Sequence, residues 1–305
     1  MPEPLVSVLI PLYNHEKYIE TCLDSIASES YRNLELIVLD DGSRDTSLAL
    51  AGAWIEAHRA RFVRVELLSQ ANAGICRTAN RLLAEAQGSY ITFVASDDAL
   101  QRDGIQARVA FLEQHPGTLA VFGDAEVMDE HGACLAASTI QDLHRGSRAA
   151  LAHPGRIAKE LILRWSIPGP VLLARRSTWD PVDGVGPYDE TLSLEDRDFY
   201  LRLLARKGLA FLDRSVARYR VHSQNVSRTP SGGLDASPMQ QAIARDIQRS
   251  VVLNLPRFRG WNRRLLALVS RCDRYRSPRK AVRYKLAQIL LRLARTMNRL
   301  GLLAE

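Results

Sequence analysis

Residues 90–100, YITFVASDDAL, decide the fold class because they join the pattern of a buried strand to two adjacent carboxylates. The first six residues are mostly apolar, aromatic or β-branched, as in a strand that is covered on both faces. Asp97 and Asp98 follow, although neighbouring carboxylates repel each other and resist burial. The pair therefore needs a partner, which is a cationic side chain, a metal ion, or only water.

This stretch ends a series in which strand-like and helix-like segments alternate. The strand patterns cover residues 5–10, 34–40, 62–68 and 90–95, and the helical patterns cover residues 15–30, 47–60 and 75–88. Such alternation predicts an α/β fold with a mixed, mostly parallel sheet flanked by helices. Ligands bind beyond the carboxyl ends of strands in open sheets of this kind. Because Asn14, Asp40 and Asp41 also follow strand ends, we expect them to share one crevice with Asp97 and Asp98.

Length and composition are ordinary for a globular protein. The 305 residues, 46% hydrophobic and 25% charged, suffice for one large or two smaller domains. Four cysteines stand far apart without a CxxC pair, which argues against a zinc site or a disulfide framework. The N-terminus lacks the basic region of a secretory signal, and no apolar run is as long as a membrane span. We expect a cytoplasmic protein, soluble or peripheral at the inner face of the plasma membrane.

The second half is patterned less evenly. Residues 134–170 carry scattered Gly, Pro, His and Ser, which is typical of a variable lid or binding region. After them we predict a helix over 192–208, a strand over 209–222, a linker at 230–238, and helices near 239–255 and 279–303. The domains predicted from this pattern are residues 1–229, with halves 1–100 and 101–229, and an Arg-rich helical extension over 239–305.

The basic character belongs to the C-terminal segment. Residues 257–305 contain twelve Arg, two Lys, one Asp and one Glu, a net charge of +12. Subtracting it from the total of +7 leaves −5 for residues 1–256. The extension is therefore predicted to form a separate basic module.

Two motifs near the N-terminus have a functional and a structural interpretation. In residues 39–47, LDDGSRDTS, Asp40 and Asp41 either accept hydrogen bonds from a ribose or a base, or form an Asx turn with a helix cap. In residues 72–80, Gly74 lets the backbone approach a ligand and Arg77 reaches a phosphate, or the motif only starts a helix.

The remaining polar motifs suit metal and acid–base chemistry. Asp97 and Asp98 offer the hard oxygen ligands that Mg²⁺ and Mn²⁺ prefer, or they cap the next helix. A metal-bound diphosphate, rather than a protein cation, would then supply the missing positive charge. Glu195 and Asp196 either provide a general base or stabilise a helix N-terminus. His222, after a strand, is a metal ligand, a phosphate contact, or neither.

Six motifs, taken in order and spacing, resemble the family 2 glycosyltransferases with the GT-A fold. They are SVLIPLYNHEKYIETCLDSI, LELIVLDDGSRDTS, NAGICRTAN, YITFVASDDAL, YDETLSLEDRDFYLRL and YRVHSQNVS. The resemblance covers roughly residues 5–227. It implies an inverting enzyme that uses a nucleotide-diphosphate sugar, with UDP-sugars favoured, and Mn²⁺ or Mg²⁺. The implied acceptor is a glycan or a lipid-linked molecule of a bacterial surface polysaccharide.

The resemblance also assigns roles to residues. The residues expected to bind the nucleotide sugar are Pro11, Tyr13, Asn14, Asp40, Asp41, Asn72, Gly74, Arg77, Asn80, Ser96 and Asp97. Asp97 and Asp98 stand at the family's DxD metal motif, and His222 would help to hold the metal and the diphosphate. Glu195 and Asp196 match the family's ED motif, with Asp196 as the base that takes the proton from the acceptor hydroxyl.

The sequence departs from the family pattern in three places. Ala95 occupies a position where the family often has a third acid, which puts the donor-sugar contact in question. The family's usual ARN reads Thr78-Ala79-Asn80, with Arg77 as a substitute on another face of the helix. The Arg-rich extension has no counterpart in the common core of the family.

The last predicted helix carries two stripes. Lys285, Gln288, Arg292, Arg295 and Arg299 form one, and the other consists of Leu286, Leu290, Leu293, Met297 and Leu300. Such a helix packs on the catalytic domain or on a second copy, or it lies on an anionic membrane surface. We expect no nucleic-acid partner.

Two other classes of protein are alternatives to the glycosyltransferase. A sugar nucleotidyltransferase is disfavoured because residues 11–18, PLYNHEKY, contain no glycine. A catalytically impaired protein that only binds sugar nucleotides has Ala95 in its favour.

Overall fold

The computed structural model describes residues 3–223, 225, 238–274 and 281–303, and its first half alternates strands with helices as predicted. Four parallel strands lie there: β1 (Val6–Leu12), β2 (Leu34–Asp40), β3 (Arg64–Ser69) and β4 (Tyr90–Phe93). The helical segments between them are α1 (Ile19–Ala27), α2 (Ser47–His58), a 3-10 turn (Arg59–Arg61) and α3 (Ile75–Glu85). Every residue of β2 is buried, which explains its apolar run from Leu36 to Leu39.

The second half adds antiparallel pairs to the sheet. Its strands are β5 (Ala99–Leu100), β6 (Ala120–Met128), β7 (Cys134–Ala136), β8 (Leu172–Arg175) and β9 (Leu209–Arg220). The strand order is β3-β2-β1-β4-β8-β6-β9-β5, and β7 pairs with β6. β8 is antiparallel to β4 and β6, whereas β9 is parallel to β6. The predicted mixed sheet is confirmed, although parallel pairing prevails only in its first half.

Helices of the second half include one that the sequence pattern did not reveal. They are α4 (Gly104–Gln114), a π-helix (Thr139–Leu143), α5 (Arg148–Leu151), α6 (Pro154–Leu163) and α7 (Asp196–Ala205), with 3-10 turns at Gly169–Val171 and Arg176–Trp179. α6 lies in the region predicted as an irregular lid. Its Pro154 occupies the first turn, where proline is tolerated, so this proline begins a helix rather than breaking one.

The sheet places the predicted loops at one edge. β1 and β2 end in register, with Leu12 opposite Asp40. β5 follows directly after Asp98 and pairs with β9, with Ala99 opposite Arg218. This pairing brings the chain that follows β9 beside the end of β4, although more than a hundred residues separate the two.

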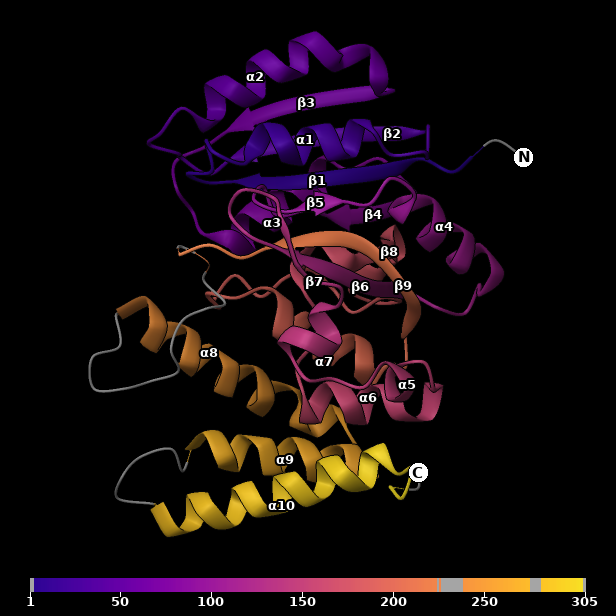
Figure 1. Cartoon of the computed structure of the whole chain (residues 1–305), viewed down its shortest axis with the longest axis vertical. Coiled ribbons are helices and arrows are strands. Elements are labelled where there is room, and N and C mark those ends of the chain that lie inside the picture. The colour runs from indigo at the N-terminus through magenta and orange to yellow at the C-terminus, as the bar shows by residue number, and fades with distance from the viewer. Residues whose placement is uncertain (1–2, 224, 226–237, 275–280, 304–305) are drawn as a thin grey trace.

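Three helices form the C-terminal extension: α8 (Pro238–Asn254), α9 (Gly260–Arg274) and α10 (Ala281–Arg299), with a 3-10 turn (Leu255–Arg257) after α8. Figure 1 shows α9 and α10 side by side at the end of the molecule opposite β3. α8 packs on α7, while α9 and α10 pack on α6. α9 is a helix that the sequence pattern missed, and of the predicted linker, residues 230–237 lie outside the described residues while Pro238 begins α8.

Candidate active site

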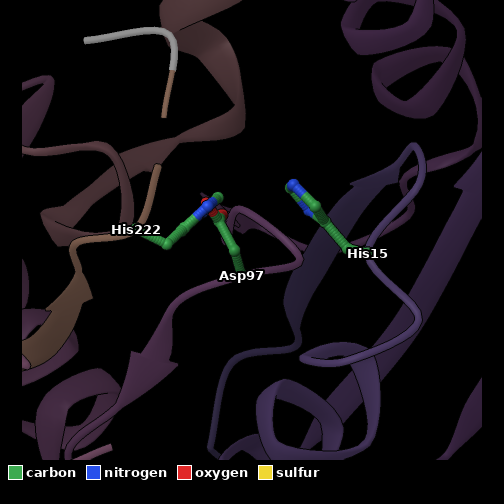
Figure 2. A group of neighbouring side chains, drawn as sticks. All are labelled: His15, Asp97 and His222. Atoms are coloured by element: carbon green, nitrogen blue, oxygen red, sulfur yellow. The ribbon is translucent and has the colours of Figure 1, made fainter. Parts of the chain in front are cut away.

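Three side chains converge beyond the strand ends: His15 after β1, Asp97 after β4 and His222 after β9 (Figure 2). One potential ligand atom from each lies within 4.8 Å of the other two. His222 Nε2 is 2.9 Å from Asp97 Oδ2, and the rings of His15 and His222 lie 6.0 Å apart. The structure thus brings Asp97 and His222 together as predicted and adds His15. The sequence signal for His15 is its place directly after Tyr13 and Asn14 at a strand end.

The loop that carries His15 is held by backbone and side-chain hydrogen bonds. Asn14 adopts a left-handed conformation with φ of 52°, and its Oδ1 accepts a hydrogen bond from the Arg44 backbone at 2.8 Å. The backbone N–H of His15 donates to Ser47 Oγ at 2.8 Å. Ser96 Oγ lies 2.7 Å from His15 Nδ1 and donates to the Pro11 carbonyl at 3.1 Å. Asn14 and Ser96 therefore orient the imidazole, while their contact with a nucleotide sugar stays a prediction.

Asp97 is held as an ionised carboxylate. Burial raises the pKa of Asp97, but the hydrogen bond from His222 and the positive charges of His15 and His222 outweigh it, so that the pKa lies below its ordinary value. Burial also lowers the pKa of His15. A cation is bound by an ionised carboxylate and by a neutral imidazole, so any proton that His15 carries would leave when a cation binds.

Asp98 has a different environment from Asp97. Its Oδ1 accepts a hydrogen bond from the Arg220 backbone N–H at 2.7 Å, and Arg220 Nε donates to the Asp97 carbonyl oxygen at 2.7 Å. Burial and the charge of Asp97 raise the pKa of Asp98 well above its ordinary value, and the guanidinium of Arg220 opposes this. Arg220 is thus a protein cation near the pair, although its guanidinium bonds the backbone carbonyl of Asp97 and not a carboxylate, and the metal-bound diphosphate stays a prediction as the partner. Asp98 is not in the converging group, and its role as a metal ligand stays a prediction.

Asp40 forms the Asx turn that was the structural alternative for this motif, whereas Asp41 binds a loop distant in sequence. Asp40 Oδ2 accepts hydrogen bonds from the backbones of Gly42 and Ser43, both at 3.2 Å. Asp41 accepts from the backbones of Ala73 at 2.8 Å and Gly74 at 3.0 Å. These bonds tie the loop after β3 to the end of β2 and leave a nucleoside contact as a prediction.

Three predicted binding residues are exposed, and two others contact the loop before α7. Tyr13 is 41% exposed, and Asn72 and Gly74 also face solvent. Asn80 is bound through both ends of its amide: Nδ2 donates to the Tyr188 carbonyl at 3.0 Å, and the Tyr188 backbone N–H donates to Oδ1 at 2.9 Å. Arg77 Nε lies 3.6 Å from a Glu190 carboxylate oxygen. Arg77 and Asn80 therefore hold the loop before α7, and their nucleotide contact stays a prediction.

Glu195 and Asp196 form a second acidic group at the start of α7. Both side chains are half-buried. Burial and the charge of Asp196 raise the pKa of Glu195 to about 7. Burial also raises the pKa of Asp196, against hydrogen bonds from the Arg197 backbone and the Trp165 side chain. These carboxyl groups exchange protons nearer to neutral pH than ordinary acids do.

The extension braces this acidic group. Asp246 of α8 accepts a hydrogen bond from the Ser193 backbone at 2.6 Å, and Arg249 donates to the Thr191 carbonyl at 3.2 Å. Asn254 donates to Asp198 at 2.6 Å. Asp198, two residues after Asp196, is thus buried and bound to α8. Because α8 fixes the loop that leads to Glu195, the extension is not independent of the candidate site.

One segment links the two acidic groups. Trp165 contacts Asp196, and four residues later Gly169 lies against Asp98, where an added Cβ would be 3.7 Å from Oδ2. Four residues span at most about 14 Å. The two groups therefore lie in the same region of the molecule.

Comparison with known proteins identifies the family of the N-terminal half. A family model described as glycosyl transferase family 2 matches residues 7–134. Residues 7–134 form a family 2 glycosyltransferase domain. Solved structures, among them that of a mannosyltransferase, share the architecture of this chain, so the predicted GT-A fold is confirmed.

Two curated glycosyltransferases and two solved structures illustrate the likeness. Glycosyltransferase GlyA of Streptococcus pneumoniae is 34% identical over 116 residues, which are 38% of this chain but 16% of GlyA. The putative glycosyltransferase EpsE of Bacillus subtilis is 29% identical over 224 residues, 73% of this chain and 74% of EpsE. The structure of S. aureus TarS 1–349 in complex with UDP-GlcNAc is 18% identical with a TM-score of 0.61, and covers 94% of this chain and 91% of that one. The mannosyltransferase PcManGT from Pyrobaculum calidifontis, in complex with GDP-Man and Mn²⁺, is 18% identical with a TM-score of 0.58, and covers 97% of this chain and 83% of its own.

Proposed function

We propose that this glycosyltransferase transfers a sugar, with inversion, from a UDP-sugar or another nucleotide-diphosphate sugar to a hydroxyl of a glycan or lipid-linked acceptor. The observation that carries the proposal is the contrast between Asp97, kept ionised between two histidines, and Glu195–Asp196, whose pKa values are raised. The first arrangement suits a cation that holds a diphosphate. The second suits a proton acceptor, and transfer needs both.

The donor set fits a divalent cation. Ligand atoms around one ion with bonds of about 2.1 Å lie within about 4.2 Å of each other. The observed limit of 4.8 Å for His15, Asp97 and His222 requires only a small closure. Imidazole ligands favour transition metals, whereas Mg²⁺ prefers oxygen. Of the two predicted ions, Mn²⁺ is therefore the better match. A cation bound here would offset the negative charge that develops on the departing diphosphate.

The acidic pair carries the other half of the reaction. As the acceptor hydroxyl attacks the anomeric carbon, the carboxylate of Asp196 takes its proton, with Glu195 as its coupled neighbour. A bond forms between the acceptor oxygen and the anomeric carbon, and the bond from that carbon to the phosphate oxygen breaks. A single displacement of this kind inverts the anomeric centre. Trp165 and the Arg197 backbone hold Asp196 in place.

The donor nucleotide sugar and the cellular compartment are proposed from the solved structures, the sequence and the cysteines. The TarS structure contains UDP-GlcNAc and the PcManGT structure contains GDP-Man, so both nucleotides are candidates, with UDP first. Ala95 removes an acid that the family often has, which is consistent with an altered donor contact. Cys22, Cys76 and Cys134 are free thiols, as in a reducing compartment, and we place the enzyme in the bacterial cytoplasm, in surface polysaccharide synthesis.

The test is turnover of a panel of UDP- and GDP-sugars with Mn²⁺, with Mg²⁺ and with chelator. We expect Mn²⁺-dependent release of the nucleoside diphosphate from one donor, and faster release when a hydroxyl acceptor is added. A protein that binds nucleotide sugars tightly with Mn²⁺ but releases nothing with any donor would instead be a binding protein.

A further inference from the structure

α10 has a buried face that is anchored to the catalytic domain. Ala287, Leu291, Ala294 and Asn298 are buried against its neighbours. Arg156 of α6 donates to the carbonyl oxygens of Asn298 and Arg299, the latter at 2.9 Å. These contacts fix the rotation of the helix about its axis.

A second face of the same helix is apolar and exposed. Its six large side chains are between 36% and 66% exposed: Leu286, Ile289, Leu290, Leu293, Met297 and Leu300. Five of them recur at alternating spacings of four and three, which is the stripe predicted from the sequence. Because the buried face already holds α10 to the protein, packing on α6 and α9 does not account for this stripe. Contiguous exposed apolar patches of this kind mark interaction sites.

The surroundings of the stripe are strongly basic. α10 contains no Asp or Glu, and residues 257–305 carry a net charge of +12. Among the described residues, Arg263, Arg264 and Arg271 of α9 and Arg292 and Arg299 of α10 are exposed. In Figure 1, α10 lies at the outer boundary of the molecule, where a flat surface can reach it.

Net charge distinguishes between the two partners that could cover the apolar stripe of α10, which are a second copy of this chain and an anionic bilayer. A second copy of this chain, bound through the same face, would bring two segments of +12 together without acidic partners. A bilayer with anionic headgroups offers phosphates to the arginines and an acyl boundary to the leucines. No helix of the described residues is long and apolar enough to cross a membrane, so contact would be with one leaflet only.

We propose that the exposed face of α10 docks this glycosyltransferase on an anionic bilayer surface. The apolar stripe inserts at the boundary between headgroups and acyl chains, and the arginines of α9 and α10 bind lipid phosphates. Docking does not depend on the proposed transfer reaction, and it is measured without sugar or metal. A lipid-linked acceptor would lie in the same surface.

The experiment measures co-sedimentation of the full chain with vesicles of phosphatidylcholine alone and with vesicles in which about one lipid in three is phosphatidylglycerol. We expect binding to the anionic vesicles, weakened by salt, and at least about tenfold weaker binding to the neutral ones. The double variant Leu290→Gln/Leu293→Gln is expected to lose most of the binding. A matched control, Val63→Gln/Val182→Gln, changes two exposed apolar side chains elsewhere and should bind as wild type.

Two results would overturn the proposal. One is equal binding to neutral and anionic vesicles, or none to either. The other is a dimer in analytical ultracentrifugation that Leu290→Gln/Leu293→Gln dissociates while vesicle binding is unchanged. Unfolding curves of both double variants check that the fold is intact. If vesicle binding is confirmed but no donor is turned over, the proposed transfer fails and the docking surface stands.

Discussion

Asp97 and the Glu195–Asp196 pair are acids at the ends of regular elements, yet the protein shifts their pKa values in opposite directions. Asp97 has two histidines beside it, and its pKa is lowered despite burial. Glu195 has a second carboxylate beside it, and its pKa is raised to about 7. Environments that separate the pKa values of acids within one site assign them different tasks. In the proposed reaction, Asp97 remains charged to hold a cation, whereas the pair takes a proton from the acceptor.

Substitution of Asp97 by Asn breaks the charged half of this comparison and has the largest expected effect. The amide keeps the shape of the side chain but loses the charge and the partner of His222. We expect Mn²⁺-dependent binding of the nucleoside diphosphate to fall by about 10²-fold and transfer by about 10³-fold. Calorimetry and a coupled nucleotide-release assay measure the two. Asp183→Asn, at an exposed position, is the control and should match wild type; wild-type binding in Asp97→Asn would refute the assignment.

Substitution of Asp196 by Asn tests the other half of the comparison, the acidic pair. Removal of a general base lowers the reaction rate by about 10²- to 10⁴-fold, whereas this substitution does not change the residues proposed to bind the cation. We therefore expect transfer to be lost while Mn²⁺-dependent nucleotide binding remains at the wild-type value. If transfer survives, Asp196 is not the base, and loss of transfer in Glu195→Gln would assign that role to its neighbour.

His15→Ala sharpens the comparison, because it removes a ligand without removing charge from Asp97. We expect Mn²⁺ affinity to fall by about tenfold and the preference for Mn²⁺ over Mg²⁺ to narrow, since an imidazole is lost. Electron paramagnetic resonance of bound Mn²⁺ measures this directly, without turnover. His131→Ala, whose side chain is 82% exposed, is the matched control. An unchanged Mn²⁺ affinity in His15→Ala would remove His15 from the site.

The sequence predicts those features that depend on a single helix or strand. It is less informative about contacts that form only when several segments, distant in sequence, come together. The apolar runs of β1, β2 and β4 predict the strands and place Asp97 at a strand end. The approach of His15 to His222 depends on the pairing of β5 with β9. This pairing could not be predicted, because β5 has only two residues and therefore no recognisable strand pattern in the sequence. The position of Arg220 beside Asp98 likewise results from the pairing of β9 and not from a local pattern in the sequence. The brace from Asp246 to Ser193 joins two segments that local patterns assign to different modules.

The dependence of the rate on pH is the smallest expected effect, and it tests the pair without removing a ligand. With Mn²⁺ saturating, transfer should fall about tenfold between pH 8 and pH 6, because the Glu195–Asp196 pair takes up a proton over this range, where the pKa of Glu195 is raised to about 7, and the protonated pair accepts the proton of the hydroxyl less readily. Glu195→Gln should move this fall to lower pH.

The pH dependence of stability gives a second measurement of the same group. The pKa of Glu195 rises from 4.5 to about 7 on folding, so its ionisation destabilises the folded state as pH rises through that window. Glu195→Gln is therefore expected to raise the Tm at pH 8 and to leave it unchanged at pH 4, and a Tm difference of equal size at both values would show that the charge of Glu195 is not the cause.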